Sequence, residues 1–203
     1  MIANSLTKSN QRTLASDINF SGIGLHKGKH TKVKITSDLP DSGIKFIRSD
    51  LNTNNTIKAL WSNVSSTKLC TTITNENNIS VSTIEHLMSA LLGMHIDNAK
   101  IYIDGPEVPI MDGSSKPFVE LIEHARIKEQ DSKRKIIKVL KKVKVCKGDS
   151  FACLSPNKEF SINFEIEFNS SVVNKQACRL QLLNGNYKKD ISSARTFGFE
   201  KDV

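Results

Sequence analysis

Two stretches of the sequence repeat apolar residues at the period of an α-helix. The first lies within Ser80–Met94, where one helical face is apolar: Ile84, Leu87, Met88, Leu91 and Leu92. Ser82 followed three residues later by Glu85 fits a capping box, and Gly93 fits a helix stop. The second stretch spans residues 114–125. We therefore expect two amphipathic helices.

Alternation of apolar and polar residues at a period of two predicts strands around both helices. In the first half, strands are expected at 12–20, 31–36, 44–48, 79–81 and 97–103, with a bend and a further strand within 61–74. In the second half they are expected at 135–146, 150–154, 160–168 and 176–183. Strands combined with amphipathic helices indicate an α+β fold, in which helices cover one face of a sheet.

The order of these elements divides the chain into two domains. An N-terminal α+β domain that carries the Glu85 helix is expected at residues 10–127, a polar linker at 128–134, and a second α+β domain at 135–203. The sequence of this second domain contains no strong helical pattern, so we expect the two-layer arrangement of the domain to be incomplete.

The positive charge is concentrated in one region. The net charge is +8, and eight lysine or arginine residues lie within residues 133–147. They alternate with isoleucine and valine, which is typical of strands with one solvated face. Arginine is scarce in this region and aromatic residues are absent, so nucleic acid is not an expected partner. An anionic, phosphate-bearing substrate remains compatible with the charge.

The sequence carries no sign of export or membrane insertion. Its four cysteines form no C-x-x-C pair, residues 1–11 contain no apolar signal segment, and no window approaches 18 apolar residues. We therefore expect a cytoplasmic protein with reduced thiols and no stable membrane insertion.

Glu85 and His86 are the first candidates for chemistry. Their side chains would point about 100° apart on a helix of 3.6 residues per turn, which suits two separate roles. In one interpretation, Glu85 closes a capping box and His86 is a satisfied core histidine. In the other, His86 binds a metal and Glu85 is a general base. The spacing alone favours the first interpretation.

Other stretches of the sequence favour the second interpretation, a metal ligand beside a general base. The sequence contains G-I-G-L-H-K-G at residues 22–28, T-I-E-H-L-M-S-A-L-L-G at 83–93, D-G-P-E-V-P-I-M-D-G-S-S-K-P-F at 104–118 and S-A-R-T-F-G-F at 193–199. In this order and spacing, with L-C-T-T-I at 69–73, they resemble the UDP-3-O-acyl-N-acetylglucosamine deacetylases, the zinc amidases of lipid A biosynthesis. The resemblance implies two similar two-layer α/β sandwich domains, with helix layers that face each other and an active site between them.

The resemblance also implies roles for single residues. By position, His86 resembles a ligand of the Zn²⁺ cofactor, Glu85 the adjacent general base, and Thr196 the threonine that hydrogen-bonds the oxyanion. The substrate would be UDP-3-O-acyl-N-acetylglucosamine, which loses its N-acetyl group. The remaining matched residues would line the metal site, the acyl passage or the substrate: Leu69, Cys70, His26, Phe168, Phe197 and Phe199.

The chain departs from the family pattern after Phe199. In the family, two more zinc ligands spaced H-x-x-x-D, a general-acid histidine and a lysine follow the threonine motif, and only four residues follow Phe199 here. We therefore expect little or no activity from these 203 residues alone. Three interpretations stay open: a deacetylase, as a fragment or completed by a separately encoded C-terminal half; a degenerate remnant; or a module that binds the sugar nucleotide or acyl chain without catalysis.

Overall fold

The protein contains two compact units. The computed structural model describes residues 9–182 and 186–199. One unit, here called the sheet unit, comprises Asn10–Ser132 together with residues 191–199. The other, here called the hairpin unit, comprises Ser9 and the described part of Lys133–Asp190. The fold is α+β, as the sequence predicts.

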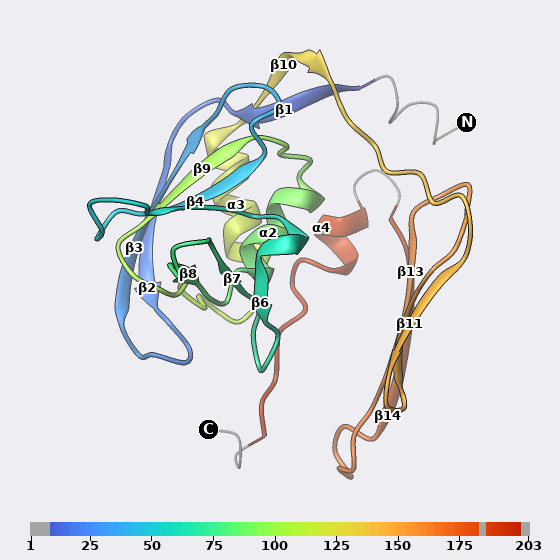
Figure 1. The fold of residues 1–203 in the computed structure, drawn as a ribbon. Coiled ribbons are helices and arrows are strands. Elements are labelled where there is room, and N and C mark those ends of the chain that lie inside the picture. Colours follow the sequence, from blue (N-terminus) through green and yellow to red (C-terminus); the bar gives the residue numbers. More distant parts are fainter. Residues whose placement is uncertain (1–8, 183–185, 200–203) are drawn as a thin grey trace. The chain divides into compact units, whose positions relative to one another are not determined.

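A five-stranded mixed sheet forms the centre of the sheet unit (Figure 1). Its order is β2 (Ile18–Ile23), β3 (His30–Ser37), β9 (Ala99–Ile103), β4 (Ile44–Arg48) and β5 (Thr56–Lys58). All neighbouring pairs are antiparallel except β4 and β9, which run parallel. The strand patterns of the sequence locate β3, β9 and β4 to within a few residues, whereas the predicted strand 12–20 overlaps only the start of β2 and no strand is predicted at β5.

The core of the sheet unit lies on one face of this sheet. Phe46 pairs with both Ile57 and Ile101, Ile35 pairs with Ile101, and all four side chains are buried. Helices α2 (Glu85–Gly93) and α3 (Lys116–Ala125) lie side by side and supply the second layer (Figure 1). The buried Phe118 of α3 meets Phe20 of β2 edge-to-face, with 5.5 Å between ring centroids. Burial of this apolar face is the main source of stability.

Two smaller sheets complete the unit. The short helix η1 (Trp61–Asn63) leads into a three-stranded sheet of β6 (Val64–Ser66), β7 (Thr72–Thr74) and β8 (Ser80–Val81). Strand β1 (Asn10–Leu14) pairs with β10 (Ile127–Lys133). The polar segment 128–134, for which composition predicts a linker, is therefore mostly a strand, because a partner from the start of the chain satisfies its backbone. The domain boundary itself stays a prediction.

The termini of α2 differ from the expected ones. No side chain caps its first turn, so the predicted Ser82–Glu85 capping box is wrong. At the other end, the left-handed residue is His95 (φ 60°) rather than Gly93. The N–H of Ile96 reaches Leu91 O at 2.8 Å, and that of His95 reaches Leu92 O at 3.0 Å, the pattern of a Schellman motif.

The apolar face of α2 is also narrower than predicted. Leu87, Ala90 and Leu91 are buried, whereas Met88 is half-buried and Leu92 is exposed.

The hairpin unit consists of two separate β-hairpins and one short helix. Strands β11 (Val143–Lys147) and β12 (Ser150–Leu154) form the first hairpin, and β13 (Ser161–Glu167) and β14 (Lys175–Gln181) form the second. The helix is α4 (Asn186–Asp190). Residues 135–142, expected to extend the first strand, form no strand.

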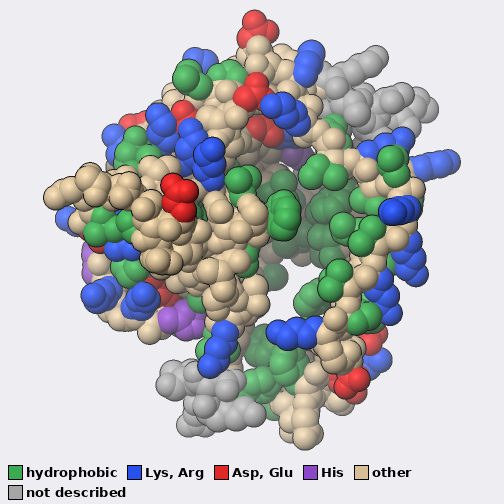
Figure 2. Space-filling model, viewed as in Figure 1, with side chains coloured by type: hydrophobic (Ala, Val, Ile, Leu, Met, Phe, Trp, Pro, Cys, Tyr) green, Lys and Arg blue, Asp and Glu red, His purple; other side chains and the backbone are tan. Residues whose placement is uncertain are grey.

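The strands of the hairpin unit form near the predicted positions, but every residue of β11 and β12 is exposed, so the expected single solvated face is not observed there. In the second hairpin, Ile162 pairs with Leu180 and Phe164 with Cys178, while Glu167 pairs with Lys175. Figure 2 shows hydrophobic side chains gathered along one side of this unit and lysine and arginine side chains along another. Of the lysines in 133–147, Lys133 ends β10, Lys144 and Lys147 belong to β11, and the others lie in the segment between these strands. Within the described residues, no helix has the length and apolar character needed to cross a membrane.

Candidate active site

Glu85 is the first residue of α2, and its half-buried carboxylate has a defined partner. Oε2 accepts a hydrogen bond of 3.0 Å from the backbone N–H of Thr71. Thr71 follows Leu69 and Cys70, and Leu69 has a left-handed backbone (φ 62°) that turns the chain sharply at this point. The hydrogen bond therefore fixes the orientation of the carboxylate and holds the Leu69–Cys70 turn next to the start of α2.

His86 follows on the same helical turn and is half-buried. Within the part of the chain that the structure describes, its imidazole has no hydrogen-bond partner. The side chain is therefore partly accessible to solvent and is not part of the buried core. A carboxylate fixed by a backbone N–H and an adjacent imidazole without a protein partner form a pair suited to one proton acceptor and one ligand.

The segment 104–113 lies beside the other motif stretches and connects them. Its Ile110 N–H donates to Ile23 O at 3.1 Å, which joins it to the glycine-rich stretch. Ser82, just before α2, donates its N–H to Pro106 O at 2.9 Å and accepts from the Val108 N–H at 3.1 Å. Stretches that are far apart in the sequence therefore meet in one region of the sheet unit.

Thr196 reaches the same region through the backbone. Its N–H donates to Gly113 O at 2.9 Å, while its side chain is exposed. Phe197 and Phe199 meet edge-to-face, with 5.8 Å between ring centroids. The S-A-R-T-F-G-F stretch thus packs against the M-D-G-S turn, although the sequence places it in the second domain.

Asp112 stabilises this turn. Its Oδ1 accepts from the N–H of Ser114 at 3.0 Å and from the hydroxyl at 2.8 Å. Burial opposes ionisation, but the two Ser114 hydrogen bonds and the charge of Arg195 lower the pKa of Asp112 below its usual value. Asp112 therefore has a structural role, and its negative charge attracts Arg195, the residue before Thr196.

The expected site residues fall into two groups. Eight belong to the connected segments of the sheet unit: His26, Leu69, Cys70, Glu85, His86, Thr196, Phe197 and Phe199. The ninth, Phe168, belongs to the hairpin unit, where its N–H donates to Asn174 O at 3.1 Å. The structure does not group Phe168 with the other eight.

One residue of this region was missed by the sequence reasoning. Glu107, between Pro106 and Val108, is only 1% exposed and accepts hydrogen bonds from the His26 loop and from Thr83. The available signal was an ionisable residue inside a proline-flanked, otherwise apolar segment, a place where a carboxylate needs partners.

A zinc ion needs several preplaced ligands, and the described residues do not supply them. Within 9–182 and 186–199, no group of three His, Cys, Asp or Glu side chains is arranged to hold a metal ion. His86 alone provides one imidazole, which is insufficient for a catalytic zinc site of three protein ligands. The described part of the chain therefore does not fit zinc by itself.

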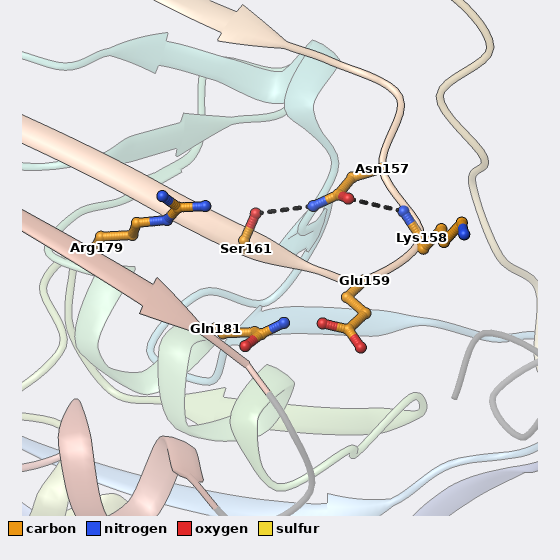
Figure 3. Close-up of a pocket in the computed structure, with 6 residues that line it drawn as sticks. All are labelled: Asn157, Lys158, Glu159, Ser161, Arg179 and Gln181. Carbon is orange, nitrogen blue, oxygen red and sulfur yellow. Dashed lines mark hydrogen bonds between the residues drawn. The ribbon is translucent and has the colours of Figure 1, made fainter. Parts of the chain in front are cut away.

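A pocket in the hairpin unit is lined by none of these candidate residues. It measures about 430 Å³ and lies where β13 and β14 meet the preceding turn (Figure 3). Six polar or charged side chains line it: Asn157, Lys158, Glu159, Ser161, Arg179 and Gln181. None of them is a candidate site residue, so this pocket does not identify the active site.

Comparison with known proteins covers nearly the whole chain. The family profile LpxC, UDP-3-O-acyl N-acetylglycosamine deacetylase, matches residues 11–203. Three similar proteins, all named UDP-3-O-acyl-N-acetylglucosamine deacetylase, come from Syntrophus aciditrophicus, Nautilia profundicola and Shewanella denitrificans. They are 42%, 45% and 43% identical to this chain. Each match covers 95% of this chain but only 61%, 65% and 64%, respectively, of the relative. These matches run within single longer proteins and give no support to a separately encoded C-terminal half.

Proposed function

The chain belongs to the UDP-3-O-acyl N-acetylglycosamine deacetylase family, and on this premise we propose that its sheet unit forms one side of a deacetylase active site. The substrate would be UDP-3-O-acyl-N-acetylglucosamine, and the reaction the removal of its N-acetyl group in lipid A biosynthesis. One observation supports this most strongly: the backbone hydrogen bonds of segment 104–113 bring Glu85, His86 and Thr196 onto connected elements.

Glu85 is proposed as the general base. It would take a proton from the water molecule that attacks the acetyl carbonyl; the C–N bond then breaks as the amide nitrogen gains a proton, so that acetate and a free amine form. The Thr71 N–H orients the carboxylate through Oε2, which leaves Oε1 for the water. The exposed Thr196 hydroxyl would donate a hydrogen bond to the oxygen on which negative charge develops.

His86 is proposed as one ligand of a zinc ion. A zinc ion held in part by His86 would supply Lewis acidity at the site. Because the described residues contain no group of three side chains arranged to hold a metal ion, we expect the 203-residue chain alone to bind zinc weakly and to show little or no turnover. The chain spans less than two thirds of the length of its relatives.

A second candidate is a binding module without catalysis. The lack of a three-ligand cluster within the described residues favours it for the chain in isolation. Such a module would bind the UDP-sugar without metal, a property that separates it from a degenerate remnant.

The four cysteines are free thiols, which fits a cytoplasmic location as part of either proposal.

The test compares the chain with a fusion. The Nautilia profundicola relative is 45% identical to this chain. The fusion joins this chain to the part of that relative that the match does not cover. We expect the fusion to bind one zinc ion and to deacetylate UDP-3-O-acyl-N-acetylglucosamine, and the chain alone to do neither. A folded, zinc-bound fusion without turnover would contradict the proposal, and so would stoichiometric zinc and turnover in the chain alone.

A further inference from the structure

Glu107 is a buried carboxylate whose hydrogen bonds join two separate segments. It is 1% exposed. Oε1 accepts from the His26 N–H and from the Thr83 hydroxyl, both at 2.9 Å, and Oε2 accepts from the Lys27 N–H at 2.9 Å. The glycine-rich loop that carries His26 and the residue two positions before Glu85 therefore share one acceptor. A buried carboxylate is costly unless such bonds satisfy it, so removing any of them affects the others.

The Thr83 end of this connection is strained. Thr83 is buried and has φ 56°, a left-handed conformation that is rare for a β-branched residue. Residues in such regions persist only where surrounding contacts enforce them, and they cluster at functional sites. The hydroxyl bond to Glu107 is one such contact. The backbone bonds of Ser82 to segment 104–113 are others. The strained residue sets the direction in which α2 begins, and hence where Glu85 and His86 point.

The loop end of this connection is built around the same carboxylate. Gly24 is buried, and a Cβ at this position would lie 2.5 Å from Glu107 Oε2. Gly24 also accepts from the Gly28 N–H and donates to Lys29 O, both at 3.0 Å, which closes the loop around His26. The loop therefore has a glycine where the carboxylate enters and two N–H groups directed at its oxygens. His26 itself is exposed, so the contact places its side chain at the surface.

We propose that Glu107 is a positioning residue that couples the His26 loop to the N-terminus of α2. Through Thr83 it holds the strained turn that aims Glu85 and His86, and through the two loop N–H groups it holds His26 at a fixed place relative to them. The proposal rests on the proposed function for its catalytic consequence. The coupling between the two segments is a property of the chain that can be measured without activity.

The test measures amide hydrogen exchange by NMR in the 203-residue chain. Thr83→Val removes the hydroxyl that bonds to Glu107, and Thr83→Ser keeps it. Thr13→Val is the matched control, because Thr13 is also a buried threonine and its hydroxyl donates to Asn98 O at 2.6 Å in another part of the sheet unit. Glu107→Gln, which nearly preserves the size of the side chain, places an amide donor against the N–H groups.

Glu107→Gln is expected to raise exchange at the His26 and Lys27 amides roughly tenfold or more, the effect of losing a hydrogen bond to a charged group. Thr83→Val is expected to raise exchange at the same two amides and at Met88, whose N–H bonds to Ile84 O in the first turn of α2. Thr83→Ser should restore all three amides. The proposal is overturned if the exchange rates of the His26 and Lys27 amides are the same in Thr83→Val as in Thr13→Val.

The catalytic consequence is tested in the fusion protein. Glu107→Gln and Thr83→Val are expected to lower kcat about tenfold or more with little change in KM, because misaligned groups lose transition-state contacts and retain substrate contacts. Thr83→Ser should restore kcat. An unsubstituted fusion without turnover would contradict the proposed function, while the exchange rates would still decide the coupling. Unchanged kcat in both variants of an active fusion would overturn the positioning role.

Discussion

The carboxylate of Glu85 and the backbone N–H of Thr71 are joined by a hydrogen bond of 3.0 Å across 14 residues of sequence. This bond replaces the local capping box that the sequence predicts. A cap would have engaged the carboxylate with its own helix, whereas the observed bond fixes it from a neighbouring turn. It leaves one carboxylate oxygen available and brings the L-C-T-T-I stretch next to the first turn of α2.

Gly24→Ala tests whether the space around Glu107 is as tight as the structure indicates. The added Cβ would meet the carboxylate at 2.5 Å, and three hydrogen bonds prevent the carboxylate from moving away. We expect a loss of about 1–3 kcal/mol in the free energy of unfolding, the usual cost of overpacking. Gly198→Ala is the control, since a Cβ there meets nothing within 4 Å. Equal stability of the two variants in urea titrations would refute the close approach.

Asp38 makes stability dependent on acidic pH. Burial opposes its ionisation, but hydrogen bonds from the Lys45 ammonium and the Leu39 N–H, with the charge of Lys45, lower its pKa from 3.8 to about 2. The pKa is depressed in the folded protein, so the stabilisation is present above about pH 4 and is lost as pH falls toward 2. A shift of this size corresponds to about 2 kcal/mol.

Urea titrations between pH 2 and 5 would measure this contribution. Asp38→Asn should flatten the pH dependence of the unfolding free energy in that range. Asp17→Asn should not, because Asp17 pairs with Lys34 at 2.9 Å in a half-exposed position, where ion pairs contribute little. An Asp38→Asn protein that loses stability below pH 4 as steeply as the unsubstituted chain would show that Asp38 is not the source.

Two leucines of α2 provide a test of the observed core. Leu87 is 0% exposed and Leu92 is 69% exposed, although the sequence pattern places both on the apolar face. Leu87→Ala should cost about 2–5 kcal/mol of unfolding free energy, from lost burial and the cavity left behind. Leu92→Ala should change it by no more than about 0.5 kcal/mol, as for other surface substitutions. Similar costs in thermal or urea unfolding would mean that α2 is rotated relative to the structure.

His86→Ala tests the proposed metal ligand in the fusion. We expect zinc affinity to fall at least ~10-fold, since catalytic sites depend on every one of their few ligands. His124→Ala is the control, because the exposed His124 hydrogen-bonds Glu120 O within α3. Zinc content after dialysis against a weak chelator would separate the two variants. Retention of zinc by His86→Ala as firmly as by His124→Ala would exclude His86 as a ligand.

The sequence predicts most of the elements and few of the contacts between them. The alternation around Phe46 and Ile101 locates central strands, because burial on one face leaves a signal within the strand itself. The same reasoning misassigns 128–134, because β10 is polar and exists through pairing with β1, more than a hundred residues away. Pairing of this kind has no local signal.

The candidate site was also predicted in part. The sequence identified the motif stretches and the adjacent pair Glu85 and His86, but not the contacts between them. The capping box failed because the backbone of Ser82 is engaged by segment 104–113, a tertiary contact that overrides the local preference. Glu107 was missed because its role depends on which N–H groups surround it in space, and the sequence does not reveal them.

The turnover number of the fusion protein with Glu85→Gln tests the central claim most directly. Gln keeps the size of the side chain and can still accept from the Thr71 N–H, but it cannot take a proton from water. We expect kcat to fall about 10²–10⁴-fold, the usual contribution of a general base, with zinc content and unfolding free energy nearly unchanged. A Glu85→Gln fusion that deacetylates UDP-3-O-acyl-N-acetylglucosamine within about tenfold of the unsubstituted fusion would contradict the account.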